Sequence, residues 1–115
     1  MPKGSEQLTK DRENEIINAC AKLYESMSFK EITIKEIGNI TSFKRSSIYN
    51  YYNTKEEIFL SLLKREYEQW TQELYSAAND EKILTKNEFA EFLAHSLEKR
   101  ETMLSLLSLN LRDME

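Results

Sequence analysis

An all-α fold is the prediction for this 115-residue chain, because turn-forming residues are rare and apolar residues recur at helical spacing. Pro2 is the only proline, and Gly4 and Gly38 are the only glycines, so most of the chain lacks the residues that turns between strands need. Apolar residues recur every three or four positions, which gathers them on one face of a helix. We expect a headpiece of three helices, a long fourth helix and an incomplete helical region after it.

The first helix is expected over residues 12–27, after a polar, mobile arm over residues 1–10. Its apolar positions lie on one face: Ile16, Ala19, Cys20, Leu23, Tyr24 and Met27. Cys20 is the only cysteine, so the chain has no internal disulfide. We expect this thiol to be a small core residue rather than a redox sensor.

The second helix is predicted over residues 34–40, because Thr33 and Glu36 have the spacing of a capping box. Its core residues are expected to be Ile34, Ile37 and Ile40. Gly38 lies inside this helix and costs about 1 kcal/mol relative to alanine. A glycine at such a position indicates that another helix passes close to it.

A short third helix is expected within residues 44–52, with Ile48 and Tyr52 on its apolar side. Thr54 and Glu57 form a second capping box, which opens a long fourth helix. Helical spacing continues there for about 25 residues, through Phe59, Leu62, Leu63, Tyr67, Trp70, Leu74 and Ala77.

Thr85 and Glu88 form a third capping box, which opens a fifth helix. That helix has four large apolar residues: Phe89, Phe92, Leu93 and Leu97. The last segment is apolar nearly all round, with Met103, Leu104, Leu106, Leu107, Leu109 and Leu111. A helix of this kind is normally buried, so we expect either a truncated chain or a self-associating one.

Charge is unevenly distributed along the chain. The whole sequence has 16 Lys and Arg against 20 Asp and Glu, a net charge of −4, yet residues 1–60 have nine of each and are neutral. Four basic residues lie in and around the third helix: Lys35, Lys44, Arg45 and Lys55. Lys55 opposes the dipole of the fourth helix unless an external anion, such as a DNA phosphate, compensates it. The acidic total therefore conceals a candidate nucleic-acid surface.

Several classes of protein are disfavoured. No apolar run approaches the roughly 18 residues that span a bilayer, and residues 1–12 lack a signal peptide's apolar core, so we expect a soluble, cytoplasmic protein with no membrane partner. The chain has no glycine-rich phosphate loop and its single histidine, His95, has no recognisable nucleophile partner. We therefore expect that the protein is not an enzyme and binds no cofactor. One side of the fifth helix has Glu88, Glu91, His95 and Glu98, but a single helix supplies an incomplete metal site, so no metal is expected.

Two short helices joined by about four residues form a helix-turn-helix, a motif whose second helix enters the major groove of DNA. Arg45 begins the second of these helices and can pair with a guanine through two hydrogen bonds. Ser47 and Asn50 can bind bases or phosphates, and the hydroxyls of Tyr49 and Tyr51 can reach phosphates. The pattern therefore predicts contact with double-stranded DNA.

The sequence resembles the N-terminal signature of the TetR/AcrR family of one-component transcriptional regulators. The similar segments are residues 33–38 (TIKEIG), Phe43, residues 46–58 (SSIYNYYNTKEEI) and residues 16–24 (IINACAKLY). Together they cover about residues 10–65.

The resemblance implies a DNA-binding domain over residues 11–54, followed over residues 55–115 by a connecting helix and the truncated start of a regulatory domain. The family's base contacts would fall on Lys35, Arg45, Ser46 and Asn50. Its phosphate contacts would fall on Thr33, Ser47, Tyr49, Tyr51 and Lys55. Lys44, beside these positions, is included in the predicted DNA-binding set.

Three positions depart from the family's pattern. Ser28 and Ser42 stand where the family usually has glycine, so we expect a positive φ at both, at about 1 kcal/mol each. Lys44 stands where a serine often caps the third helix. Loss of the cap predicts a third helix that frays until DNA orders it.

The resemblance also implies a repressor that a small-molecule effector releases from a palindromic operator. Four aromatic residues are expected to line an effector pocket between the fourth and fifth helices: Tyr67, Trp70, Phe89 and Phe92. The full-length protein would be a homodimer, whereas this chain is expected to self-associate through residues 100–115. The alternative function is a helical protein-interaction module that uses the leucine-rich C-terminal segment.

Overall fold

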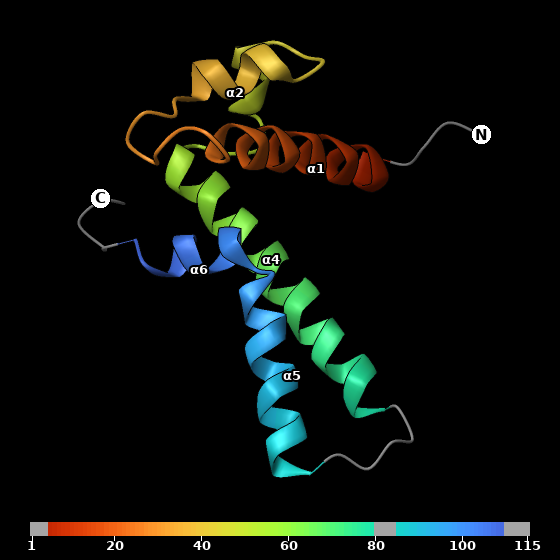
Figure 1. Ribbon diagram of the computed structural model, residues 1–115. Helices are drawn as coiled ribbons and strands as arrows, with labels where there is room; N and C mark the ends of the chain where they lie inside the picture. Colours follow the sequence, from red (N-terminus) through yellow and green to blue (C-terminus); the bar gives the residue numbers. More distant parts are fainter. Residues whose placement is uncertain (1–4, 80–84, 110–115) are drawn as a thin grey trace. The chain divides into compact units, whose positions relative to one another are not determined.

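The computed structural model describes residues 5–79 and 85–109. Helices make up 75% of these described residues and no strand occurs among them, which confirms the all-α class (Figure 1). The chain divides into two compact units, which are described separately: a first unit of residues 5–62 and a second unit of residues 63–109. Within the described residues no helix combines the length and the apolarity that crossing a membrane would require.

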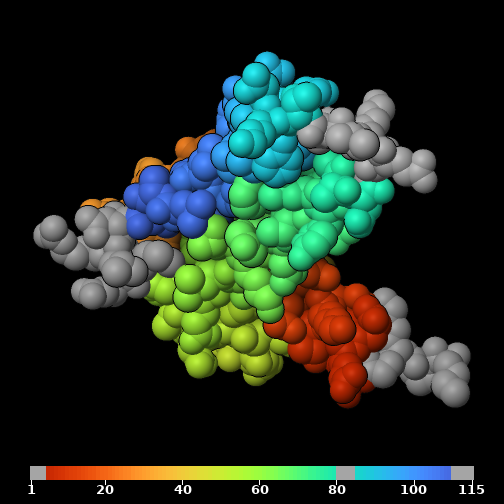
Figure 2. Space-filling model, turned by 90° about the horizontal axis from the view of Figure 1, so that it is seen from below, coloured from red at the N-terminus to blue at the C-terminus, as the bar shows by residue number. Residues whose placement is uncertain are grey.

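Helix α1 spans Ser5–Tyr24. The prediction of a mobile arm is therefore wrong for residues 5–10, and its remainder, residues 1–4, lies outside the described part of the chain. Polar residues support these first turns, since the Gln7 amide donates a hydrogen bond to Asp11 at 3.0 Å and Glu6 lies favourably at the positive end of the helix dipole. Figure 2 shows these turns, in red, at the surface, where their side chains are exposed.

Helix α2 spans Ile34–Ile40, the predicted range. The hydroxyl oxygen of Thr33 accepts a hydrogen bond from the Glu36 N–H at 3.2 Å, so the predicted N-cap is present. The close approach that Gly38 indicates is confirmed, because a Cβ atom there would lie 3.0 Å from the Cα of Arg45. A side chain at position 38 would thus force α2 and the following helix apart.

Helix α3 spans only Arg45–Ile48, which is shorter than the segment expected within residues 44–52. Its N-cap residue, Lys44, makes no side-chain capping bond, as the sequence predicted. Turns follow the helix, with the N–H groups of Tyr51 and Tyr52 both donating to the Ile48 carbonyl at 2.9 Å. A helix of four residues is not stable by itself, so its position must depend on its neighbours.

Helix α4 spans Lys55–Ala78, and its first two turns complete the core of the first unit. Phe59 packs edge to face on Tyr24 and Phe29, with ring centroids 5.4 and 4.8 Å apart. Six core side chains have no exposed surface: Ile16, Ile32, Ile37, Ile48, Ile58 and Phe59. Because these turns of α4 are buried here, the first unit extends to Leu62.

Two predicted details of this core differ. Cys20 is fully buried, as expected, but Ile40 is 48% exposed and Ile34 is only half-buried. Helix α1 also ends before residue 27, and the Met27 N–H closes a turn on the Leu23 carbonyl at 2.9 Å.

The second unit contains the rest of α4, helix α5 over Lys86–Glu98 and helix α6 over Glu101–Leu107. Thr85 and Glu88 form the predicted reciprocal capping box at the start of α5. α5 runs back alongside α4 (Figure 1), and the indole N–H of Trp70 donates to the buried Ser96 hydroxyl at 2.9 Å. On α6, Met103 and Leu106 are buried, while Leu104 and Leu107 are 42% and 60% exposed; Leu111 lies outside the described residues.

Candidate nucleic-acid interface

An open concavity on the first unit brings together half of the predicted DNA-binding residues. It has a volume of about 380 Å³ and is lined by Ile32, Thr33, Ile34, Lys35, Arg45, Tyr49, Thr54, Lys55 and Glu56, and we call it the basic concavity. Thr33 and Lys35 come from the start of α2, Arg45 and Tyr49 from α3 and its end, and Lys55 from the start of α4. Its three cations outnumber the single carboxylate of Glu56, so an anion is the ligand that its charge favours.

The side chains that line the basic concavity differ in their own contacts. Lys35 and Arg45 are exposed, and Tyr49 is 45% exposed, so all three present polar groups to solvent. Arg45 is the first residue of α3, the position from which a recognition helix contacts base edges.

Lys55 has partners within the chain. Its ammonium donates to the carbonyl oxygens of Phe29 at 2.6 Å and Ile32 at 3.0 Å, and it lies 4.3 Å from the centroid of the Phe29 ring. The ammonium thus has partners inside the chain, where the sequence predicts an external anion. Lys55 instead fastens the first turn of α4 to the 28–32 turn.

The other five predicted residues do not line the basic concavity. Lys44, Ser46 and Asn50 are exposed, whereas Ser47 and Tyr51 are half-buried. The Tyr51 ring meets Phe43 edge to face with centroids 6.3 Å apart, so its orientation is set by the connection between α2 and α3.

Two residues of α1 that the sequence analysis did not select contact that connection. The Glu15 carboxylate accepts hydrogen bonds from the Ser42 backbone N–H and, at 2.9 Å, from the Ser42 hydroxyl. The Arg12 guanidinium lies 4.7 Å from the centroid of the Phe43 ring. The bonds from Ser42, with help from the charge of Arg12, lower the pKa of Glu15. These partners lie too far apart in sequence for any local motif to reveal them.

The strain expected at the two serines is absent, because no described residue has a positive φ. Ser42 adopts an ordinary conformation and is held by Glu15. Ser28 exchanges bonds with Glu31, whose carboxylate accepts from the Ser28 N–H at 2.9 Å. Serine therefore supplies hydrogen bonds at both positions where the sequence predicts a steric cost.

The aromatic residues expected to line an effector pocket have different surroundings. Phe89 lines an open, mainly apolar cavity of about 250 Å³ with Thr71, Leu74, Tyr75 and Ala78. Trp70 is held instead by Ser96, and Tyr67 is 55% exposed. Phe92 is half-buried. Of the four side chains, Phe89 alone lines this cavity.

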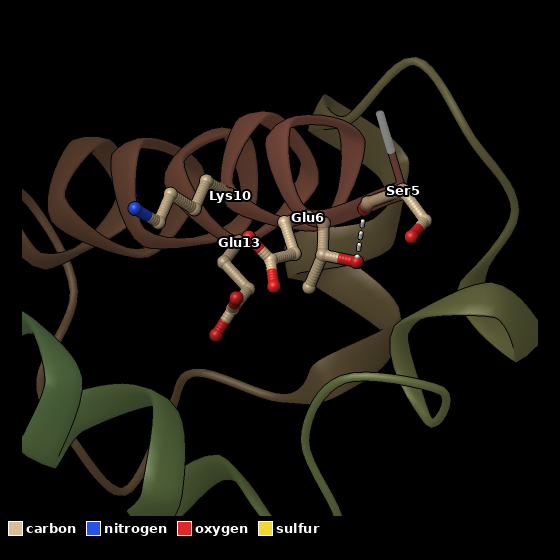
Figure 3. Close-up of a pocket in the computed structure, with 5 residues that line it drawn as sticks. Ser5, Glu6, Lys10 and Glu13 are labelled. Atoms are coloured by element: carbon tan, nitrogen blue, oxygen red, sulfur yellow. Dashed lines mark hydrogen bonds between the residues drawn. The ribbon is translucent and has the colours of Figure 1, made fainter. Parts of the chain in front are cut away.

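A second concavity on the first unit has the opposite charge. Its volume is about 280 Å³, and its lining residues are Ser5, Glu6, Thr9, Lys10 and Glu13, all on α1. Figure 3 shows these side chains, with the Thr9 hydroxyl bonded to the Ser5 carbonyl at 2.9 Å. Two carboxylates against one ammonium do not favour a phosphate. Among residues 5–79 and 85–109, no three His, Cys, Asp or Glu side chains form a group that could hold a metal ion.

Comparison of the chain with protein-family models, with curated proteins and with solved structures finds no match.

Proposed function

We propose that this chain is a sequence-specific DNA-binding transcriptional regulator, with α2 and α3 as a helix-turn-helix of the TetR/AcrR type. The observation that supports this proposal most strongly is the basic concavity, which gathers Lys35, Arg45 and Tyr49 from two adjacent short helices. The close contact of the helices at Gly38 is consistent with the same motif.

In this proposal the two sides of the basic concavity have separate roles. Arg45 begins α3 and reads a base edge, where an arginine can make two hydrogen bonds to guanine. Lys35 takes the second base contact that the resemblance implies, and the Tyr49 hydroxyl contacts a phosphate and fixes the register of the helix on the duplex. Lys55 contributes positive charge, but its main role is to hold the turn beneath the site.

Repression and release by a small-molecule effector belong to the same proposal and rest on the resemblance to the family. Binding to a palindromic operator requires two copies of the motif about one helical turn apart. The exposed Leu104 and Leu107 favour self-association through α6.

Replacing Leu107 with glutamate is then expected to lower the mass measured by sedimentation at micromolar concentration. A wild-type chain that stays monomeric would contradict the association.

The same two leucines are the observation that favours the alternative function, a helical protein-interaction module. The salt dependence of DNA binding distinguishes the two functions. Phosphate contacts release counterions, so the affinity for duplex DNA falls steeply as salt rises, with a slope that grows with the number of contacts.

The test is fluorescence anisotropy of labelled duplex DNA over a salt series. We expect Arg45→Ala and Lys35→Ala to weaken binding and to make the salt dependence shallower. Lys22→Ala is the matched control, because Lys22 is an exposed cation of the first unit that pairs with Glu25 and lies outside the basic concavity. Equal effects of all three substitutions would argue against an interface at this site.

A further inference from the structure

Helix α3 has little means of holding its own position. It has four residues and no side-chain cap, yet Arg45 and Tyr49 depend on it for their placement. The segment that carries it, residues 43–52, therefore needs support from elsewhere in the first unit.

That support comes from one face of α1. Arg12 and Glu15 are three residues apart and so project from neighbouring positions on the helix. Glu15 binds both polar hydrogens of Ser42, and Arg12 covers the ring of Phe43. Phe43 in turn meets Tyr51, so the contact reaches the far end of the segment.

The connection is also fixed from the α2 side. The Thr41 hydroxyl lies 2.9 Å from the carbonyl oxygens of both Gly38 and Phe43. Residues 41–43 are thus held on both sides immediately before α3 begins. Rotation of this connection would move Arg45, which is the first residue of α3 and lies two residues after Phe43.

We propose that Arg12 and Glu15 are positioning residues, which orient segment 43–52 by holding Ser42 and Phe43. This inference rests on the proposed function, because the segment is the one that would contact DNA. It goes beyond that function by assigning control of the contact to two α1 side chains outside the basic concavity.

The first test needs no DNA. Amide hydrogen exchange is compared for the wild-type chain, Glu15→Ala and the matched control Glu6→Ala, an exposed glutamate of the same helix. We expect Glu15→Ala to reduce protection selectively at the amides of Ser47, Tyr51 and Tyr52, whose bonds hold the segment together. Unchanged protection there, or an equal loss throughout the first unit, would overturn the proposal.

The second test measures the affinity for the duplex that the wild-type chain enriches from a randomised pool. Glu15→Ala is expected to weaken binding roughly tenfold at a temperature where circular dichroism shows full folding. Ser42→Thr retains both donors and should bind like wild type, whereas Ser42→Ala should bind more weakly. Equal affinity of Glu15→Ala and wild type would overturn the positioning role.

These outcomes separate the two proposals. If the wild-type chain enriches no duplex, the proposed function fails, and the exchange measurement still decides whether α1 orients the segment. If the wild-type chain binds and the Glu15 and Ser42 variants bind equally well, only the positioning role fails.

Discussion

The two units of the chain are stabilised in different ways. In the first unit, isoleucine and phenylalanine side chains from four helices have no exposed surface. Among the described residues of the second unit, the buried apolar side chains are Met103 and Leu106, and polar contacts made by Arg100 and Trp70 also join its helices. The basic concavity therefore lies on the unit with the larger set of fully buried apolar side chains among the described residues.

The largest effect is expected for Phe59→Ala in the first unit. This ring is fully buried against Tyr24 and Phe29, so its loss should lower the free energy of unfolding by about 3–5 kcal/mol. Urea denaturation measures the change. Leu60→Ala is the control, since Leu60 is 54% exposed and should cost much less. Similar losses for both would show that the apolar core is not what stabilises this unit.

In the second unit the corresponding substitution is Arg100→Met. The guanidinium lies 3.0 Å from Glu73 and 3.8 Å from Glu66, and these three side chains are 15–30% exposed. Removing the cation leaves two part-buried carboxylates without their positively charged partner. We therefore expect the free energy of unfolding, measured by urea denaturation, to fall by about 1–3 kcal/mol. Lys99→Met removes an exposed neighbouring charge and should change stability little. An unchanged midpoint for Arg100→Met would contradict polar stabilisation of this unit.

Trp70→Phe tests the second polar contact. The substitution removes the indole donor to Ser96, whose own hydroxyl still donates to the Leu93 carbonyl at 2.7 Å. We expect the free energy of unfolding, measured by thermal denaturation, to fall by about 1 kcal/mol. Tyr67→Phe keeps the neighbouring ring and alters only an exposed hydroxyl. A loss as large for Tyr67→Phe would show that the Trp70 hydrogen bond is not the cause.

The smallest effect concerns pH. The pKa of Glu15 is lowered chiefly by the Ser42 backbone bond, so folding favours the charged carboxylate. Its stabilisation is present above the unfolded pKa of about 4.3 and is lost as pH falls through the lower folded value. Glu15 is only half-buried, so solvent screens this interaction and we expect it to contribute well under 1 kcal/mol to the free energy of unfolding. Glu15→Gln should make the free energy of unfolding fall less steeply as pH decreases below about 4.3. An unchanged pH dependence would argue against this hydrogen bond in solution.

The sequence predicts helices well where the signal is local. Thr33 and Thr85 mark the starts of α2 and α5 through side chains that cap N–H groups within one turn. Gly38 predicts a close helix because the constraint acts directly at that residue. The start of α1 was missed because its first turns are polar and have no apolar period to detect.

Contacts between distant segments are less accessible to sequence reasoning. Lys55 looks like a phosphate ligand in isolation, but its ammonium reaches carbonyls more than 20 residues away in the chain. Glu15 and Ser42 form a pair that no spacing rule would select. The sequence therefore indicates candidate residues for DNA contact, whereas the side chains that orient them become visible only in the folded chain.

The most direct test of the proposed function is selection of duplexes from a randomised pool by the wild-type chain and by Arg45→Ala, followed by sequencing. We predict that the wild-type chain enriches a two-fold symmetric motif. Arg45→Ala should bind with a loss of about 1–3 kcal/mol and lose preference at one base pair of each half-site, because its guanidinium no longer pairs with a base. Failure of the wild-type chain to enrich any motif, or enrichment of the same motif with equal affinity by both proteins, would contradict base reading by this helix.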